Sequence, residues 1–309
     1  MAEAGQLGRA LPAMHDLKGR IVGFMREAST EITPSEEERL PELAAILAAG
    51  TAVYVAHTPN AGFADVIRAA LAAQRAGFLA TPHIAVRRVP DRQTLKRGLA
   101  DLRAGGVAHI LLIAGDAPRP MGEFSCTMDV LESRLLEQSG IVQIGVAGHP
   151  EGHNAVDADR LWGALEAKQA WAAGSGHRMH IVTQFGLDGG AFKRWERELM
   201  RRRIRLPVRL GIAGPAPLLK LAHFAIQCGI GASMRALMRN LSAAAQSSDL
   251  ATSPDQHLLT LLGSPLPAQI AAPHFFAFGG ALETARWMSK VAAGAFDIDA
   301  AAPQFRMQG

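Results

Sequence analysis

Residues 80–114 read ATPHIAVRRVPDRQTLKRGLADLRAGGVAHILLIA. The stretch begins with an apolar run over Ala80 to Arg87 and ends with a second apolar run over His109 to Ala114. Between them, Asp91 to Ala104 carries apolar residues at helical spacing and stops at Gly105, as a glycine-capped helix does. A strand, a helix and another strand in this order predict a βαβ unit, whose two strands lie parallel.

The same alternation extends through most of the chain. We expect eight strands, at residues 21–32, 51–57, 80–87, 109–114, 142–147, 180–185, 208–213 and 275–278. We expect helices at residues 35–49, 61–76, 91–104, 123–138, 157–173, 191–203, 217–228 and 281–293. The first of these helices begins with Ser35 and Glu38, which have the spacing of a capping box.

Eight strands that alternate with helices predict a closed (βα)8 barrel of the TIM type, an α/β fold that usually occupies about 250 residues. An open, doubly wound sheet is the alternative, but it normally shows a glycine-rich fingerprint after an early strand, and the first strand is followed by TPSEEE. We expect one barrel domain over residues 1–309. Residues 1–19 form an N-terminal extension in this interpretation, and residues 230–272 form an elaborated connection before the last strand.

The composition excludes several classes of protein. With 309 residues, 49% of them hydrophobic and 19% charged, the chain is neither fibrous nor disordered. Cys126 and Cys228 form no CxxC motif, which favours a reducing, cytoplasmic compartment. No apolar run reaches the ~18 residues of a membrane span, and no secretory signal is evident, so we expect no membrane partner.

The net charge of +4 raises the question of nucleic-acid binding. The densest basic run, Arg201 to Arg205, follows apolar residues at helical spacing and is typical of a helix C-terminus, where cations complement the helix dipole. We therefore expect no nucleic-acid partner and attribute the charge to attraction of an anionic small molecule. The sequence leaves a homo-oligomer open.

Polar side chains follow six of the predicted strands. In a βα barrel the active site lies at the C-terminal ends of the strands, so these residues should converge. They are Glu31, His57 with Thr58, His83, Asp116, His149 with Glu151 and His153, and Gln184 with Asp188. This convergence predicts a site at one rim of the barrel.

Several of these residues have two interpretations. A carboxyl group among apolar residues has a raised pKa and suits general-acid catalysis, and burial and exposure of Glu31 are equally open. Asp116 suits either a turn or a site, and His57 and His83 each suit a buried core histidine. His149 to His153 contains two histidines and a carboxylate, but its spacing differs from the helical HExxH motif, so we expect no metal.

At these strand ends the sequence resembles the methylenetetrahydrofolate reductase family. The similar segments are S-T-E-I-T-P at 29–34, L-I-A-G-D at 112–116, G-V-A-G-H-P-E-G-H at 145–153, I-V-T-Q-F at 181–185 with Asp188, and H-F-F-A-F at 274–278. They occur in the family's order between about Glu27 and Trp287. The resemblance implies a barrel that binds FAD and uses NADH or NADPH to convert 5,10-methylenetetrahydrofolate into 5-methyltetrahydrofolate.

The resemblance also implies roles for individual residues. Glu31 would be the general acid, and Asp116 would stabilise a cationic intermediate and tune the flavin. Gln184, Asp188 and Phe278 would bind the folate. The residues that would line the flavin are His57, Thr58, His83, Ala114, Gly115, Asp116, His149 and Lys168.

The chain departs from the family pattern on the flavin side. The family's R-G-D reads A-G-D at Ala114 to Asp116. Polar residues that hold the ribose and phosphates in the family are replaced by Leu161, Ala164 and Ala167. Either other groups hold FAD, with Arg87 and Arg119 as candidates, or flavin binding is weak or lost.

The resemblance therefore implies an oxidoreductase that interconverts the two tetrahydrofolate derivatives by hydride transfer, in a direction that the sequence leaves open. One alternative is a folate-binding barrel that acts in methyl transfer. Another is a flavin-independent reductase that moves hydride directly from NAD(P)H. A non-catalytic folate-binding protein is disfavoured, because an acid beside the folate, Glu31, costs stability and has no use in storage.

Overall fold

The computed structural model of the protein describes residues 16–186, 189–217, 221, 251–299 and 304–308. Eight parallel strands close into a barrel in the order β1-β10-β7-β6-β5-β4-β3-β2. These strands are β1 (Ser29–Ile32), β2 (Ala52–Val55), β3 (Leu79–Ala85), β4 (His109–Ile113), β5 (Gln143–Gly148), β6 (Arg178–Thr183), β7 (Val208–Ala213) and β10 (Ile270–Phe276). The predicted α/β barrel of the TIM type is confirmed.

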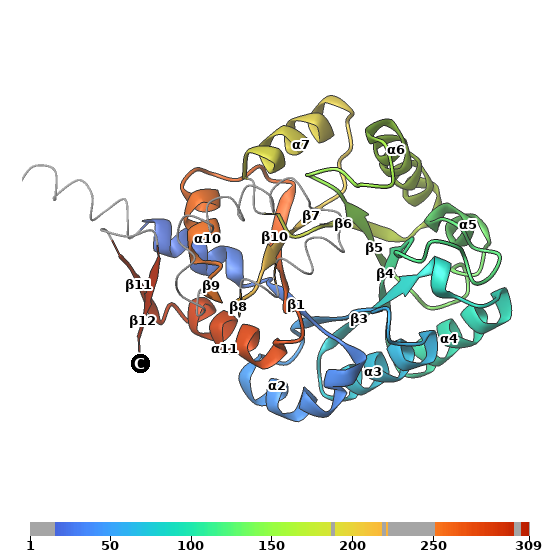
Figure 1. Ribbon diagram of the computed structural model, residues 1–309, viewed down its shortest axis with the longest axis horizontal. Coiled ribbons are helices and arrows are strands. Elements are labelled where there is room, and N and C mark those ends of the chain that lie inside the picture. The colour runs from blue at the N-terminus through green and yellow to red at the C-terminus, as the bar shows by residue number, and fades with distance from the viewer. Residues whose placement is uncertain (1–15, 187–188, 218–220, 222–250, 300–303, 309) are drawn as a thin grey trace, which may run out of the picture.

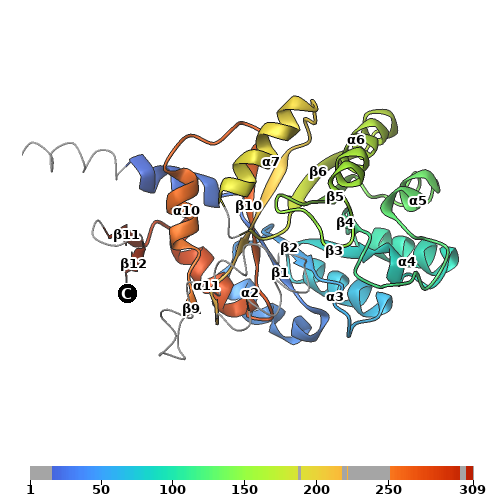
Figure 2. The ribbon, with the colours of Figure 1, turned by 45° about the horizontal axis from the view of Figure 1, so that its top comes forward.

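Helices surround these strands, as Figures 1 and 2 show from two directions. The α-helices are α2 (Leu40–Ile46), α3 (Phe63–Arg75), α4 (Arg92–Ala104), α5 (Thr127–Glu132), α6 (Ala158–Ser175), α7 (Gly189–Arg201), α10 (Asp255–Leu262) and α11 (Ala281–Ala292). Two 3-10 helices, η1 (Pro34–Arg39) and η2 (Val86–Arg88), follow β1 and β3. Two small antiparallel sheets pair β8 (Ala216–Pro217) with β9 (Ala251–Thr252) and β11 (Phe296–Ile298) with β12 (Phe305–Met307).

The first predicted strand was wrong over most of its length. Residues 16–25 are helical, and β1 begins only at Ser29. Ile21 and Met25 lie four residues apart and are both buried, which is the spacing of one helix face. A short apolar run fits either structure by composition, and here the helical period prevailed.

Two predicted helices are shorter than expected. The segment 35–49 divides into η1 and α2. The predicted capping box at Ser35 and Glu38 was wrong, because the box is formed by Thr33 and Glu36, whose side chain accepts a hydrogen bond from the backbone N–H of Thr33 (2.9 Å). The helix predicted at 123–138 is reduced to α5. It ends because the Ser133 hydroxyl donates to the Val130 carbonyl and Arg134 adopts a positive φ of 64°.

The connection predicted at 230–272 is described only in part. Residues 230–250, and nearly all of the helix predicted at 217–228, lie outside the described residues. The described remainder contains β9 and α10, and β10 begins at Ile270, five residues before the predicted strand. The side chain of Asp255 at the start of α10 is buried and accepts hydrogen bonds from the Trp287 indole (3.1 Å) and the Phe305 backbone (3.0 Å). This contact joins α10, α11 and β12.

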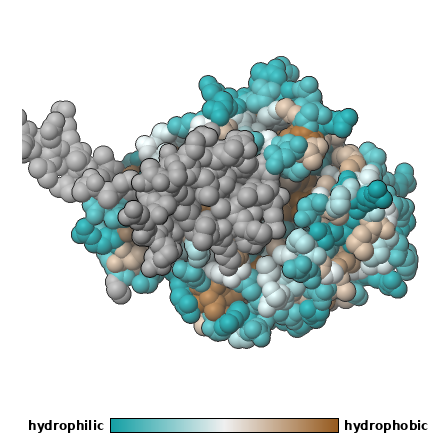
Figure 3. All heavy atoms as spheres, viewed as in Figure 1, coloured by the Kyte–Doolittle hydropathy of each residue, from teal (hydrophilic) through white to brown (hydrophobic). Residues whose placement is uncertain are grey.

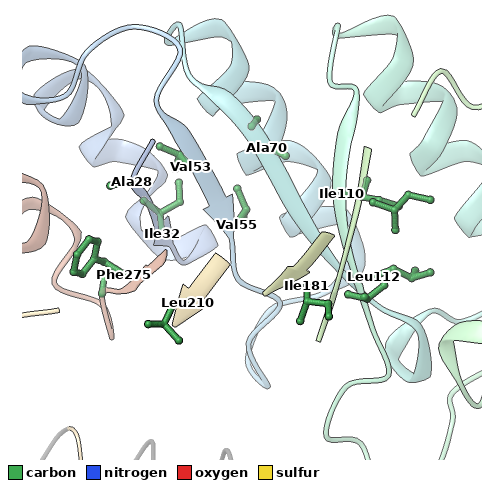
Figure 4. Close-up of a cluster of buried hydrophobic side chains, with 14 of the residues drawn as sticks. Ala28, Ile32, Val53, Val55, Ala70, Ile110, Leu112, Ile181, Leu210 and Phe275 are labelled. Atoms are coloured by element: carbon green, nitrogen blue, oxygen red, sulfur yellow. The ribbon is translucent and has the colours of Figure 1, made fainter. Parts of the chain in front are cut away.

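Alternate residues of each strand face the helices or the barrel interior. The outward set packs against the helices as the main hydrophobic core, and Figure 4 shows part of it, including Val53, Ile110 and Phe275. A second cluster faces inward and contains Ala52, Tyr54, Leu111 and Val182.

The inward layer also contains polar side chains that hydrogen-bond to one another, although His274 Nε2 has no partner among the described residues. The Tyr54 hydroxyl lies 3.0 Å from His180 Nε2, and Gln143 Nε2 lies 3.1 Å from the other ring nitrogen of His180. Ser29 Oγ lies 3.0 Å from His274 Nδ1. The interior below the rim is therefore a packed, partly polar plug, and ligands are restricted to the strand ends above it.

Candidate active site

The closed parallel barrel brings the C-terminal ends of all eight strands to one rim. Glu31 lies within β1, and His83 lies within β3. The other predicted residues that the structure describes follow the ends of β2, β4, β5, β6 and β10, except Lys168, which lies on α6. Asp188 lies outside the described residues. Figure 3 shows apolar side chains near the centre of one face, with hydrophilic side chains on the surrounding helices.

Glu31 is a buried acid at this rim. Its residue is 9% exposed, and the backbone N–H groups of Ala277 and Phe278 donate to its carboxyl group. Burial, together with the nearby Glu36 charge, raises the pKa of Glu31 to about 8, although the two amide donors favour the charged form. A carboxyl group with this pKa is mostly protonated at neutral pH, which is the state a general acid needs.

The turn after β10 supplies these two amide donors. Phe278 has a positive φ of 51°, which is costly for an aromatic residue, and Gly279 follows with a φ of 72°. The Phe278 ring meets Phe185 edge to face at 5.0 Å between centroids and stacks on Phe276 at 6.2 Å. The turn therefore places backbone donors on Glu31 and an aromatic wall beside it.

Asp116 is paired with Arg88, an arginine after the end of β3 that the predicted site did not include. Arg88 donates to Asp116 Oδ1 through Nε (3.1 Å) and Nη2 (2.8 Å), and to the Pro59 carbonyl through Nη1 (3.3 Å). The Arg88 side chain is 17% exposed and that of Asp116 is 55% exposed. The pair joins the ends of β2, β3 and β4, so a cation remains beside Asp116 although Ala114 replaces the family arginine.

Two histidines line this part of the rim as neutral rings. Burial, with a smaller contribution from the Arg88 charge, lowers the pKa of His57 to about 4. Burial also lowers the pKa of His83 to about 3, and its Nε2 atom has no hydrogen-bond partner in the described part of the chain. Thr58 follows His57 and closes a turn, because its carbonyl accepts from Ala61 N–H (3.1 Å).

Gly115 lies where the β4 loop approaches β3. It has a φ of 85°, and a Cβ atom there would lie 3.0 Å from Ala85 Cβ. Ala114 is bound to the same neighbour strand, because its carbonyl accepts from Arg87 N–H (3.0 Å). The A-G-D segment is therefore held close to the end of β3.

Arg87 holds the loop after β4 through its guanidinium group. Its guanidinium group donates to three backbone carbonyls, those of Ala117 (2.7 Å), Pro118 (2.7 Å) and Ser125 (3.4 Å). These contacts use three of the five guanidinium N–H donors, which leaves two for a ligand. Arg119 is exposed within that loop.

Lys168 and His149 mark the rim between β5 and α6. Lys168 is 8% exposed, burial lowers its pKa to about 8, and no carboxylate pairs with its ammonium group among the described residues. Burial lowers the pKa of His149 to about 3, with smaller contributions from His153 and Lys168. A buried cation without a counter-ion is costly, so this position fits an anionic ligand group.

Gln184 follows β6 instead of lying inside it. Its backbone N–H donates to the Gly148 carbonyl (2.9 Å), and its carbonyl accepts from Thr183 Oγ1 (2.8 Å). Thr183 Oγ1 in turn accepts from Gly211 N–H (2.8 Å). These contacts fix the backbone of Gln184 between β5 and β7.

Gly211 is required for this arrangement. A Cβ atom there would lie 2.4 Å from the Thr183 carbonyl oxygen and 2.5 Å from that of Gln184. We expect Gly211→Ala to lower the free energy of unfolding by at least about 2 kcal/mol, because two backbone groups would have to move. Urea unfolding tests this, with Gly163→Ala as the control.

Gly163 lies in α6, and no atom lies within 4 Å of its added Cβ position. This control substitution should raise the stability by about 1 kcal/mol, because alanine is the better helix former. Equal effects of the two substitutions would contradict the close approach at Gly211.

Several residues of the site and its support were absent from the predicted set, namely Glu36, Tyr54, Arg88, His180 and His274. Local sequence gave little signal for them, because Arg88 is one of two adjacent arginines and Tyr54 and His180 lie in apolar runs. Across the part of the chain that the structure describes, no three His, Cys, Asp or Glu residues are placed to hold a metal ion. The helices described include none that is long and apolar enough to cross a membrane.

A family model described as methylenetetrahydrofolate reductase matches residues 33–250 of the chain. Among solved structures, a mutant tryptophan synthase alpha-subunit from the hyperthermophile Pyrococcus furiosus matches with 12% identity and a TM-score of 0.48, over 87% of this chain and 98% of that chain. Dihydropteroate synthase from Thermus thermophilus matches with 14% identity and a TM-score of 0.42, over 84% and 91%. D-psicose 3-epimerase from Clostridium cellulolyticum matches with 9% identity and a TM-score of 0.37, over 86% and 96%.

Proposed function

The chain belongs to the methylenetetrahydrofolate reductase family, and from this membership we propose that it interconverts 5,10-methylenetetrahydrofolate and 5-methyltetrahydrofolate in the cytoplasm. NADH or NADPH is the reductant in this proposal. The observation that carries it is Glu31, a carboxyl group that burial at the barrel rim keeps protonated near neutral pH, with a pKa of about 8.

The proposed reaction needs one proton and one hydride. Opening the five-membered ring of the folate breaks a carbon–nitrogen bond, and the departing nitrogen takes the proton of Glu31. The other nitrogen and the methylene carbon then form an iminium cation. Addition of hydride to this carbon gives the N-methyl group, and Glu31 is left as a carboxylate that regains its proton from solvent. Two amide donors, from Ala277 and Phe278, stabilise that carboxylate.

Asp116 is the group that we assign to the cation. Its charge lowers the energy of the iminium in this proposal, and its two hydrogen bonds from Arg88 hold the carboxylate in place at the rim. Gln184 and Asp188 bind the polar edge of the folate ring. The aromatic wall of Phe278, Phe276 and Phe185 suits the ring's flat face.

FAD is the cofactor that we assign to this rim, where it supplies a ring that carries two electrons between NAD(P)H and the folate. The residues that would hold it are His57, Thr58, His83, Ala114, Gly115, Asp116, His149 and Lys168. Two observations support the fit. The buried ammonium group of Lys168 suits a phosphate, and His83 Nε2 is a buried polar atom without a described partner.

Other observations favour a second candidate, a flavin-independent reductase that passes hydride directly from NAD(P)H to the folate. The side chains of Leu161, Ala164 and Ala167 offer no hydrogen bonds to a ribose or phosphate, and three of the five Arg87 donors already bind backbone carbonyls. The same observations suit a folate-binding barrel that acts in methyl transfer, which needs neither a flavin nor a nicotinamide.

An anaerobic assay separates these candidates. The purified protein is tested with 5-methyltetrahydrofolate and a redox dye, and with 5,10-methylenetetrahydrofolate and NADH or NADPH, each with and without added FAD. We expect turnover that depends on FAD, and a visible absorption spectrum of the flavin bound to the protein. Turnover by protein that shows no flavin absorption and receives no FAD assigns the flavin-independent reaction, and no turnover under any condition would overturn the reductase proposal.

A further inference from the structure

Glu36 bridges two segments that meet at the catalytic rim. Its Oε2 atom accepts from the backbone N–H and the hydroxyl of Thr33, each at 2.9 Å, just after β1. Its Oε1 atom accepts from the backbone N–H of Ala281 at 3.2 Å, at the start of α11. Three donors thus meet one carboxylate, which connects the end of β1 to the end of the 277–281 turn.

The same turn carries the donors of Glu31. Ala277 and Phe278 donate to the Glu31 carboxyl group, while Ala281, three residues after Phe278, donates to Glu36. The positive φ of Phe278 is an unfavourable conformation for a residue with a side chain, and it persists only where surrounding contacts fix it. Glu36 supplies one such contact, at the point where the turn enters α11.

We propose that Glu36 is a positioning residue for Glu31: its carboxylate fixes the 277–281 turn that donates to Glu31, and it places a negative charge close to that acid. This inference rests on the proposed function for its catalytic meaning, but its effect on the Glu31 proton can be measured in the protein without ligand.

The physical basis is repulsion between like charges at a buried site. Ionised Glu31 would place a second negative charge near Glu36, and burial of Glu31 beside the half-buried Glu36 leaves the two charges only partly screened by water. The repulsion increases the proton affinity of Glu31, so it helps Glu31 to return to its acid form after each turnover. A neutral side chain at position 36 would remove the repulsion.

The test is an infrared pH titration of the carboxylic acid band of Glu31, with Glu31→Gln as the baseline that lacks this band. In Glu36→Gln, we expect the midpoint of this band to fall by about one pH unit. The glutamine carbonyl oxygen can still accept from Ala281 N–H and hold the turn, so the loss of a nearby unit charge in partly screened surroundings sets the shift. The matched control is Glu38→Gln. It removes the same charge from an exposed side chain two residues after Glu36. Its midpoint should stay that of the unmodified protein.

A second variant covers the case in which Glu36→Gln does not fold. Glu36→Asp keeps the charge on a shorter side chain. The midpoint of the Glu31 band in this variant should therefore remain above the midpoint in Glu36→Gln. If Glu36→Gln cannot be obtained folded, the Glu36→Asp midpoint is compared with the unmodified protein and should lie near it. A midpoint that falls in Glu36→Asp, or one that does not move in folded Glu36→Gln, would overturn the proposal.

Activity gives a separate readout. If the protein is a reductase, the alkaline limb of its pH–rate profile should move with the infrared midpoint in Glu36→Gln. If the protein shows no reductase activity but the infrared midpoint moves, the proposed function fails while the role of Glu36 stands. If turnover is observed and the midpoint does not move, the role of Glu36 fails alone.

Discussion

Glu31→Gln should lower the rate of reductive turnover by roughly 10²–10⁴-fold, the usual contribution of a general acid, while folate binding is largely kept. Glutamine has nearly the same shape as glutamic acid, and its carbonyl oxygen can still accept from the Ala277 and Phe278 amides. What it lacks is the proton. Steady-state turnover and folate titration measure the two effects separately.

The same substitution should make the protein more stable in alkaline solution. Burial raises the pKa of Glu31 from 4.5 to about 8, so the folded state binds this proton more tightly than the unfolded chain does. This contribution to stability is complete below about pH 4.5 and is lost as the pH rises through 8, at about 1.4 kcal/mol per pH unit. Glu31→Gln has no such loss.

We therefore compare the free energy of unfolding of Glu31→Gln with that of the unmodified protein at pH 5 and at pH 9. The difference between the two proteins should shift in favour of Glu31→Gln by up to about 4 kcal/mol from pH 5 to pH 9. Urea unfolding at the two pH values measures this difference. Glu27→Gln, at an exposed side chain four residues earlier, is the control and should show no pH-dependent gain. A Glu31→Gln effect that is the same at both pH values would show that Glu31 is not a buried acid.

The second large effect is expected in mild acid, where the protein should unfold near pH 5. Burial lowers the pKa of His57 to about 4 and the pKa values of His83, His149 and His180 to about 3. Burial also places the pKa of His274 well below 6.5. These rings stay neutral in the folded state, whereas the unfolded chain protonates them below about pH 6.5.

The sign follows from proton binding. Between about pH 6.5 and pH 4 the unfolded chain binds more protons at these five histidines, so stability falls as the pH falls, by up to about 7 kcal/mol per pH unit in total. The stability contribution of Glu31 changes with pH in the opposite direction and offsets the contribution of one of the five histidines. The remaining loss, about 5–6 kcal/mol per unit, is comparable to the ~5–15 kcal/mol stability of an ordinary domain.

Circular dichroism and tryptophan fluorescence against pH measure this transition. His180→Gln should move its midpoint to lower pH, because glutamine keeps a polar group between Tyr54 and Gln143 but cannot take up a proton. His153→Gln, at an exposed histidine, is the control and should leave the midpoint nearly unchanged. A fold that persists to pH 4 would contradict neutral, buried histidines in the barrel.

Much of the fold was predictable because it depends on local patterns. The period of apolar residues, the glycines after helices and the order of strands and helices each lie within a few residues of one another. Predictions from these patterns failed where two patterns overlapped. The segment 21–25 is apolar enough for a strand, but it is a helix that buries Ile21 and Met25. Such predictions also failed at Ser133, where one side-chain hydrogen bond helps to end a helix that the apolar pattern continues.

The position of the candidate site was predictable for the same reason. In a parallel barrel all strand ends meet at one rim, so a polar residue at the end of a predicted strand is placed without knowledge of its neighbours. Its neighbours were not predictable. Asp116 meets Arg88 across 28 residues, and Glu36 meets Ala281 across 245 residues. No spacing rule connects residues so far apart along the chain.

By itself, the sequence determined the barrel and the set of polar residues at its rim. Only the tertiary structure decided their chemical state: that Glu31 is buried among amide donors from the turn after β10, that Asp116 carries an arginine partner, and that the interior histidines are neutral. The reason is that secondary structure follows from short-range periodicity. Proton affinity follows from desolvation and charge, which depend on every segment that the fold brings near the group.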